Sequence, residues 1–169
     1  NLRELKSGEI GELQGRGPMV MKGYYNKPED TAETIIDGGW LRSGDLASFT
    51  EDGHLVIAGG RLRDMIIRGG ENIYPAEIEN VLQTHDAVAG VAVFGVPDNY
   101  YGEAVAAAVK LSGATSTADL QALCSARIAK FKCPAIIYRV DAFPLTPSGK
   151  IRKVELRAWA NENRMDRLP

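Results

Sequence analysis

The chain has 169 residues, of which 44% are hydrophobic and 25% are charged, and its formal net charge is −2. This is the composition of a globular protein with one domain or two small ones. The nearly balanced charge argues against a nucleic-acid-binding surface, and no apolar run is long enough to cross a bilayer. Because the first residue is not Met and no leader is recognisable, we expect a piece of a longer protein.

The first sixty residues are rich in glycine and proline and are predicted to be mostly β, with little core of their own. Short strands are expected at 9–14 and 19–21, extended segments at 40–43 and 46–49, and a further strand at 54–58. Asp52-Gly53 predicts the hairpin turn before that last strand. Asn26 is expected to cap a short helix that has Pro28 in its first turn.

The remainder of the chain shows strands and helices in alternation. Strands are predicted at 64–68, 88–96, 104–111 and 136–140, and helices at 75–83, 116–128 and 152–161. Ser116 and Asp119 have the spacing of a capping box at the start of the second helix. This order predicts an α+β unit of two or three layers, in which a three-stranded sheet carries the helices. We place the boundary with the β-rich segment near residues 60–63.

The stretch from 59 to 79, GGRLRDMIIRGGENIYPAEIE, contains a turn suited to ligand binding. A charged cluster and a short apolar run lead into Gly69–Gly70 and Glu71, and Pro75 then begins a helix. A strand that ends in glycines exposes its backbone, and flanking charges favour a charged ligand there. The glycine pair is equally compatible with a tight turn that has no ligand, and the two interpretations are not exclusive.

A second motif, PLTPSGK, ends at Lys150. It is not a phosphate-binding P-loop, because Pro144 and Ile151 occupy positions where that motif needs a glycine and a Ser or Thr. A lysine on a loop can deliver a compact positive charge on a long stem into a site built elsewhere. The alternative is a solvated surface lysine without a role.

Asp45 and Arg61 form a third candidate group. A carboxylate at the end of a strand can accept hydrogen bonds from both hydroxyls of a ribose. A nearby arginine can donate to the same sugar or to phosphate oxygens. The simpler alternative is an ion pair between a turn aspartate and a surface arginine.

Four stretches occur in a fixed order along almost the whole chain. They are GEIGELQGRGPMVMKGYYNKPEDT at 8–31, WLRSGD at 40–45, GRLRDMIIRGGENIYPAEIE at 60–79 and PLTPSGK at 144–150. Together they resemble motifs of the adenylate-forming (AMP-binding) superfamily, which includes acyl-CoA synthetases, adenylation domains of peptide synthetases and beetle luciferases. MIIRGGENIYPAEIE is most similar to the acid–CoA ligase branch. The resemblance implies that residues 1–60 end a large adenylation domain and that residues 61–169 form the C-terminal lid domain.

The family makes an acyl-adenylate from a carboxylic acid and ATP, and then passes the acyl group to a thiol, usually that of CoA. By resemblance, Asp45 and Arg61 contact the ribose of ATP, and Lys150 bridges the carboxylate and the phosphate oxygens during the first step. Mg²⁺ would accompany the ATP phosphates in the full-length enzyme, and no metal-ligand cluster is expected in this chain. His54 and His85, the two histidines, stand outside any metal-ligand pattern.

The second half-reaction involves a different set of positions. Arg63 matches the family's hinge, about which the lid rotates between the two steps. That rotation would bring Gly69, Gly70 and Glu71 to the passage for the pantetheine arm of CoA. Tyr101 and Phe131 match positions where relatives contact the CoA nucleotide; ordinary packing is the alternative role for both.

Two departures from the family pattern stand out. Gly59–Gly60 is one glycine longer than the usual approach to Arg61, which either forms a bulge or displaces the arginine. Cys133 occupies a position where some CoA ligases have a basic residue. Cys133 and Cys124 fit a reduced, cytoplasmic setting, although their spacing leaves a disulfide open.

The resemblance implies the C-terminal fragment of an ATP-dependent acyl-CoA synthetase of fatty acid metabolism, with a fatty or aryl acid and CoA as partners. The fragment needs the missing N-terminal domain, so we expect it to be inactive alone and to bind no cofactor tightly. A peptide-synthetase lid is one alternative, although no carrier domain follows in this sequence. A non-catalytic interaction module is another, against which the retention of Asp45, Arg61 and Lys150 argues.

Overall fold

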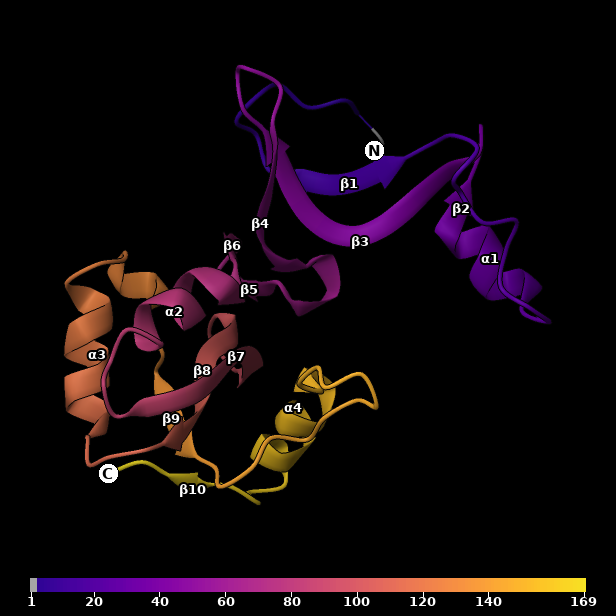
Figure 1. The fold of residues 1–169 in the computed structure, drawn as a ribbon. Helices are drawn as coiled ribbons and strands as arrows, with labels where there is room; N and C mark the ends of the chain where they lie inside the picture. The colour runs from indigo at the N-terminus through magenta and orange to yellow at the C-terminus, as the bar shows by residue number, and fades with distance from the viewer. Residues whose placement is uncertain (1–2) are drawn as a thin grey trace. The chain divides into compact units, whose positions relative to one another are not determined.

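The computed structural model describes residues 3–169, which divide into two compact units. The first unit extends to Arg63, and the second comprises Asp64–Pro169 (Figure 1). Within the described residues, no helix has the length and apolar character needed to span a membrane.

The first unit is built on an antiparallel sheet. Its elements are β1 (Gly11–Gly15), α1 (Pro28–Thr34), β2 (Ile35–Ile36), β3 (Trp40–Phe49) and β4 (Leu55–Arg61). β3 is the central strand and pairs with each of the other three strands. The expected segments at 40–43 and 46–49 are thus one continuous strand. The hairpin turn at Asp52-Gly53 is confirmed, with Gly53 at φ +84°.

Two local predictions for this unit are wrong. Residues 19–21 form a turn and bend instead of a strand. Asn26 does not cap α1, because it lies in the left-handed region at φ +53° and Lys27 holds the N-cap position. Pro28 begins the helix as expected, since its missing N–H costs nothing in the first turn.

β4 has a bulge just before Arg61, where the glycine pair was expected either to form a bulge or to displace the arginine. Ala47 pairs with Ile57, whereas Asp45 pairs with Arg61, so two additional residues of β4 are accommodated between these pairs. Gly60 has φ +139°, a conformation that a side chain would oppose. The bulge therefore keeps Arg61 opposite Asp45 and does not displace it.

The second unit has a larger mixed sheet. Its elements are η1 (Leu62–Asp64, which begins in the first unit), β5 (Ile66–Arg68), β6 (Glu71–Ile73), α2 (Pro75–Leu82), β7 (Val88–Asp98), β8 (Gly102–Leu111), α3 (Thr117–Ser125), η2 (Lys130–Lys132), β9 (Ile136–Arg139), α4 (Lys153–Asn161) and β10 (Asp166–Arg167). β8 is antiparallel to β7 and parallel to β9. The α+β class is confirmed, but the described sheet has six strands where three were expected. The strand predicted at 64–68 joins this sheet as β5, and the short strands β6 and β10 were not predicted.

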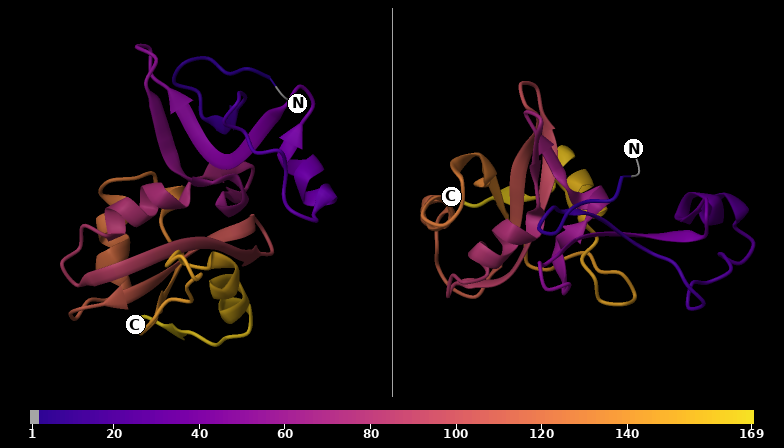
Figure 2. Two further views of the ribbon diagram at one scale, coloured as in Figure 1. Left: turned by 45° about the vertical axis from the view of Figure 1, so that its right-hand side comes forward. Right: turned by 90° about the horizontal axis from the view of Figure 1, so that it is seen from above.

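Helices cover both faces of this sheet, as Figures 1 and 2 show. α2 and α3 bury Ile78, Leu82 and Leu120 against one face, and α4 buries Leu156 against the other. Alternate residues of β7 and β8 supply the two cores, since successive side chains of a strand point to opposite faces. Phe94 in β7 is completely buried in the α4 layer.

Local signals of the second unit are confirmed at α3. Ser116 Oγ accepts a hydrogen bond from the N–H of Asp119, and the Asp119 carboxylate accepts one from the N–H of Ser116. The residues around β10 then close the unit. Thr117 donates from its hydroxyl to the Leu168 carbonyl (2.6 Å) and from its N–H to the Pro169 carbonyl (2.7 Å). Leu168 is itself part of the core.

Candidate functional site

The loop that carries Lys150 is a small hairpin between β9 and α4. Leu145 and Ile151 form a β-bridge at its base. The N–H of Arg152 donates to the Pro144 carbonyl (2.8 Å) and closes the base. Ile151 packs on the α4-side core, so the stem of the loop is anchored while its tip is in solvent. Figures 1 and 2 show the tip projecting away from the sheet.

Thr146 organises the tip of this loop. Its N–H donates to the Lys150 carbonyl (2.8 Å), and its Oγ1 accepts from the N–H of Lys150 (3.1 Å). The N–H of Gly149 donates to the Thr146 carbonyl (2.9 Å) while Gly149 has φ +81°, a conformation that favours glycine. The N–H and the carbonyl of Lys150 are therefore both held by Thr146 across the hairpin.

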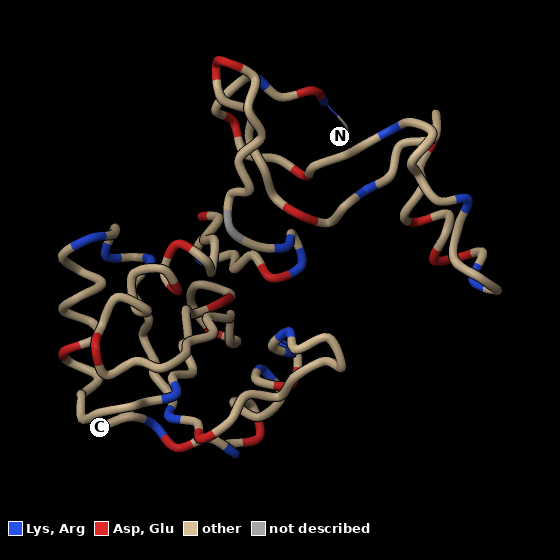
Figure 3. Tube along the Cα trace, in the orientation of Figure 1, with Lys and Arg blue, Asp and Glu red and all other residues tan. Residues whose placement is uncertain are grey.

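The side chain of Lys150 is exposed and has no ion-pair partner within residues 3–169. Basic residues gather at this point, because Lys150, Arg152 and Lys153 follow one another closely (Figure 3). The other two are paired within the unit: Arg152 with Glu155, and Lys153 with Glu79. An unpaired ammonium on a fixed backbone can reach a ligand outside the unit.

The glycine pair forms a tight turn between β5 and β6. Arg68 pairs with Glu71, so Gly69 and Gly70 are the two loop residues of a hairpin, at φ +59° and +87°. Positive φ at both positions is the geometry of a type I′ turn. The N–H of Gly69 donates to the Tyr101 carbonyl (2.8 Å), and this bond joins the turn to the β7–β8 turn.

Arg68 and Tyr101 form the side-chain surface next to this turn. The guanidinium carbon of Arg68 lies 3.9 Å from the centre of the Tyr101 ring, a cation–π contact. A Cβ atom on Gly69 would lie 3.2 Å from Cδ1 of the same ring. The tyrosine is 41% exposed and thus remains open to solvent. The turn consequently presents bare backbone beside a flat aromatic ring.

Two carboxylates accept backbone hydrogen bonds at the β7–β8 turn and in β5, next to the glycine turn. Asp98 Oδ1 accepts from the N–H groups of Tyr101 (2.8 Å) and Tyr100 (2.9 Å), and these bonds lower the pKa of Asp98. Glu103 Oε2 accepts from the N–H of Ile67 (2.7 Å). The position of Tyr101 therefore depends on an ionised aspartate three residues earlier.

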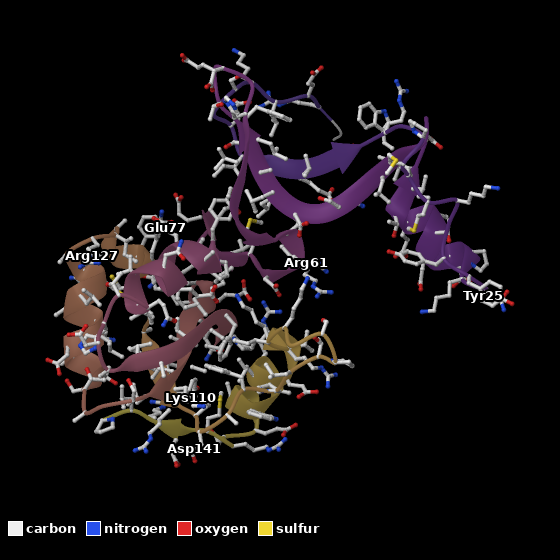
Figure 4. All side chains as sticks on the ribbon, in the orientation of Figure 1. Tyr25, Arg61, Glu77, Lys110, Arg127 and Asp141 are labelled. Atoms are coloured by element: carbon white, nitrogen blue, oxygen red, sulfur yellow. The ribbon has the colours of Figure 1, made fainter. Side chains whose placement is uncertain are left out.

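Asp45 and Arg61 meet in the first unit at two bulges. Arg61 Nε lies 3.5 Å from Asp45 Oδ1, and the side chains are 45% and 41% exposed (Figure 4). Ser43 Oγ donates to the Leu13 carbonyl (2.7 Å) and accepts from the N–H of Asp45 (3.0 Å). The register shifts on both sides of β3 here, so Asp45 lies where the regular pairing of β3 is interrupted.

The remaining predicted residues lie at separate places. Arg63 is exposed in η1, where the two units divide. Phe131 is 38% exposed in η2, and the ammonium of Lys132 lies 5.9 Å from its ring centre. Lys132 is held by both carboxylate oxygens of Glu77 (2.7 and 2.8 Å), whose position Figure 4 labels.

The two cysteines are free, and no disulfide joins them. Cys124 is completely buried in α3, and burial raises the pKa of its thiol to about 11. Cys133 is half-buried, and its Sγ lies 3.5 Å from Ser125 Oγ. Among the described residues, no three His, Cys, Asp or Glu side chains gather as a metal site would require.

The structure joins some predicted residues and leaves others apart. Gly69, Gly70, Glu71 and Tyr101 share one end of the second unit, and Asp45 and Arg61 are paired in the first. Among the described residues, no hydrogen bond or ring–ring contact links Phe131 to Tyr101. Sequence reasoning missed Arg68, Asp98 and Thr146, the residues that hold these groups in place. The motif letters alone do not show which neighbour a turn residue contacts.

The comparisons with known proteins agree with the motifs. Residues 77–150 match the model of the AMP-binding enzyme C-terminal domain. The chain is 49% identical over 157 residues to YngI of Bacillus subtilis, an acyl-CoA synthetase by name, covering 92% of this chain and 28% of that protein. It is 48% identical over 161 residues to the mitochondrial medium-chain acyl-CoA ligase ACSF2 of Rattus norvegicus, and the match covers 90% of this chain and 26% of that protein.

Solved structures give the same result. o-Succinylbenzoate CoA synthetase from Bacillus subtilis, in complex with its acyl-adenylate, superposes with a TM-score of 0.85 at 38% identity over 90% of this chain and 31% of that one. The amide bond synthetase McbA from Marinactinospora thermotolerans superposes with a TM-score of 0.84 at 42% identity, over 92% of this chain and 32% of that one. The chain therefore spans about a quarter to a third of these relatives. Residues 77–150 therefore belong to the AMP-binding enzyme C-terminal domain family, and the chain as a whole is similar to a part of acyl-CoA synthetases and related adenylate-forming enzymes.

Proposed function

We propose that this chain is the C-terminal part of an acid–CoA ligase that forms an acyl-adenylate from a carboxylic acid and ATP and then transfers the acyl group to CoA. The relatives named as acyl-CoA synthetases support the reaction class. The observation that carries the proposal is the exposed ammonium of Lys150 on a loop whose backbone is fixed. A group of this kind acts on a reactant that another part of the protein binds.

In the first half-reaction, Lys150 would contact the carboxylate and the α-phosphate oxygens. Two anions must approach each other there, and a cation placed between them offsets their repulsion as charge moves toward the leaving pyrophosphate. Asp45 would accept hydrogen bonds from the ribose hydroxyls, and Arg61 would donate to the same sugar. Mg²⁺ would have to be held by the ATP phosphates and by residues outside this chain, since the described residues offer no cluster for it.

In the second half-reaction, the second unit would rotate about Arg63. The division of the chain immediately after this residue supports the assignment. Rotation would withdraw Lys150 and present Gly69, Gly70 and Glu71 to the pantetheine arm, where missing side chains admit a thin chain. Tyr101 and Phe131 would contact the nucleotide of CoA. The exposure of both rings is compatible with this role.

The expected test is the substitution Lys150→Ala in the full-length protein. Adenylation, measured as ATP–pyrophosphate exchange with a panel of carboxylic acids, should fall about 100-fold or more, because a preorganised charge at the reacting atoms is lost. Thioester formation from a supplied acyl-adenylate should stay within about twofold. Lys110→Ala is the matched control, since Lys110 is an exposed lysine of the same unit (Figure 4). Equal loss in both steps would contradict the assigned role.

The relative that makes amides favours a second candidate for the acyl acceptor. An amine in place of CoA would leave the first half-reaction unchanged and alter only the product. The same assay therefore includes CoA and simple amines as competing acceptors. Preferential thioester formation supports a CoA ligase, whereas preferential amide formation replaces CoA by an amine in this proposal.

The 169-residue chain alone should show no turnover, because a lysine loop cannot adenylate without the site that it enters. Acyl-CoA formation by the purified chain would contradict this. We also expect the full-length protein to work in a compartment with reduced thiols, such as the cytoplasm, given the two free cysteines. The rat relative is mitochondrial by name, so the mitochondrion is a second candidate compartment.

A further inference from the structure

The outer edge of β7 lacks a strand partner within residues 3–169. β7 pairs with β8 along its whole length, and β9 and β5 pair with the other side of β8. An unpaired edge exposes backbone N–H and C=O groups, which proteins cover with side chains or with another element. The two helical layers on either side of the sheet both reach this edge, and they meet at one carboxylate.

That carboxylate belongs to Glu79 on α2. Its Oε1 accepts a hydrogen bond from the N–H of Val93 on β7 (2.7 Å). The same oxygen lies 2.7 Å from the ammonium of Lys153, the first residue of α4. α2 packs on one face of the sheet and α4 on the other. Glu79 therefore joins three layers around the edge of β7.

The bridge is well shielded from solvent. The side chains of Lys153 and Glu79 are 16% and 23% exposed. Exposed surface pairs contribute little to stability, whereas loss of one partner from a shielded pair leaves the other charge without compensation. The lysine is therefore committed to this oxygen, in contrast to the exposed Lys150.

The position of Lys153 in the chain connects the bridge to the loop that carries Lys150. Lys153 follows Lys150 by three residues and Arg152, which closes the base of the loop, by one. The N-cap of α4 has no side-chain hydrogen bond of its own. The first turn of α4 is thus fixed laterally by Lys153, and the descending arm of the loop starts from that fixed point.

We propose that Glu79 is a positioning residue for Lys150, acting through Lys153. The Glu79 carboxylate anchors the start of α4 to α2 and to the edge of β7, and this anchor determines where the loop 144–152 leaves the unit. The inference rests on the proposed function of Lys150 in adenylation. A lysine that must reach a reacting phosphate tolerates little displacement, since a shift of about 1 Å can cost about 100-fold in rate.

The first experiment compares four single variants of the full-length protein and the double variant Glu79→Gln/Lys153→Met. Glu79→Gln retains an oxygen for the Val93 N–H but loses the charge that holds Lys153. Lys153→Met removes the ammonium and keeps the apolar stem, and Lys153→Arg keeps the charge. Lys110→Met is the control, an exposed lysine without an ion pair among the described residues.

Glu79→Gln and Lys153→Met should each lower kcat for adenylation about tenfold or more, with KM for ATP changed less than about twofold. Thioester formation from supplied acyl-adenylate should be retained, and Lys153→Arg should restore most of the adenylation rate. The double variant should lose no more than either single one, because both break the same bridge. A loss no greater than that of Lys110→Met, or equal loss in both half-reactions, would overturn the inference.

The second experiment needs no activity and uses the 169-residue chain. Amide hydrogen exchange at Gly149, Lys150 and Arg152 reports how firmly the loop is held, since their N–H groups are bonded within it. Glu79→Gln should raise these exchange rates about tenfold and leave those of α3 unchanged. Unchanged loop exchange would refute the positioning role even if Lys150 proves catalytic. Suppose instead that loop exchange is faster in Glu79→Gln but that Lys150→Ala adenylates at the full rate. The proposed function of Lys150 would then be refuted, while the role of the Glu79–Lys153 bridge in holding the loop would stand.

Discussion

Gly69 and Gly70 occupy adjacent positions of one turn but face different surroundings. A Cβ on Gly69 would lie 3.2 Å from the Tyr101 ring, whereas a Cβ on Gly70 would meet no atom within 4 Å. Both residues have positive φ, which costs any L side chain other than Asn or Asp about 1–2 kcal/mol. The conformational cost is therefore shared by the two positions, and the steric cost falls on Gly69.

We predict that Gly70→Ala lowers the free energy of unfolding of the second unit by about 1 kcal/mol and that Gly69→Ala lowers it further. Gly70→Asn should lose less than Gly70→Ala, because Asn tolerates the left-handed region. Urea unfolding of the three variants measures the order. Equal stability of the two alanine variants would show that the Tyr101 ring moves aside without cost.

The two thiols should differ in reactivity. Burial raises the pKa of Cys124 to about 11, so little thiolate exists near pH 8, and the side chain is completely covered. Iodoacetamide at pH 8 should therefore modify Cys133 first in the native chain and reach Cys124 only after unfolding. Peptide mass spectrometry locates the label. Early modification of Cys124 would mean that α3 opens locally.

At the scale of an element, the capping box makes α3 sensitive to acid. The hydroxyl and N–H of Ser116 donate to the Asp119 carboxylate, and these bonds lower the pKa of Asp119. A carboxyl whose pKa is lower in the folded state stabilises the fold above its unfolded pKa, near 4. That contribution is lost as the pH falls through the folded pKa.

Ser116→Ala should cost about 1 kcal/mol at pH 7, the usual effect of losing an N-cap. The pKa of Asp119 should rise toward its ordinary value, because the Ser116 hydroxyl, whose hydrogen bond lowers that pKa most, is removed. The stability difference from the parent chain should consequently be smaller at pH 3 than at pH 7. Carboxyl NMR titration and urea unfolding at both pH values provide the measurements. A stability difference that is the same at both pH values would show that the effect of the cap does not depend on the charge of the Asp119 carboxylate.

The sequence predicted elements whose signals are local. Pro75 at the start of α2, the Ser116–Asp119 box and the turn at Asp52-Gly53 were each visible in a few neighbouring residues. The strand predicted at 19–21 does not form, because the apolar triplet MVM pairs with no strand among the described residues. β10 was missed because its two residues, Asp166 and Arg167, are exposed and show no alternation.

The candidate site was predicted as motifs, and the contacts that hold it were not. Lys150 and the glycine pair could be singled out because glycine and lysine stand in short recognisable patterns. The bridge from Glu79 to Lys153 joins residues 74 positions apart, and nothing in either local sequence indicates the other. Which carboxylate covers the edge of β7 depends on the packing of two helices on opposite faces, and this is decided by the tertiary fold.

At the scale of the whole molecule, the two units differ in their cores. Among residues 3–63, the buried hydrophobic side chains are Leu46 and Ala47, whereas the second unit holds two extended core clusters. In the first unit, Leu55, Val56 and Ile57 of β4 are about half-exposed. A segment that buries so little apolar surface cannot offset the entropy of ordering its backbone.

We predict that residues 64–169 expressed alone fold with a single cooperative urea transition and a dispersed NMR spectrum. Residues 1–63 alone should give neither, because their core is too small. Circular dichroism and two-dimensional NMR of the two segments compare them directly. Cooperative folding of residues 1–63, or its absence from residues 64–169, would contradict this division of stability.

The hydrogen bonds that Thr117 donates to Leu168 and Pro169 have a consequence for synthesis of the protein. Because Leu168 fills the core beneath α3, the layer built by α2 and α3 stays incomplete until the ribosome has released these residues. The nascent unit therefore keeps apolar surface uncovered until residues 168 and 169 have left the ribosome, and chaperones can bind that surface during the interval. In the 169-residue chain, a tag fused directly after Pro169 would disturb these hydrogen bonds, whereas a flexible spacer before the tag would leave them intact.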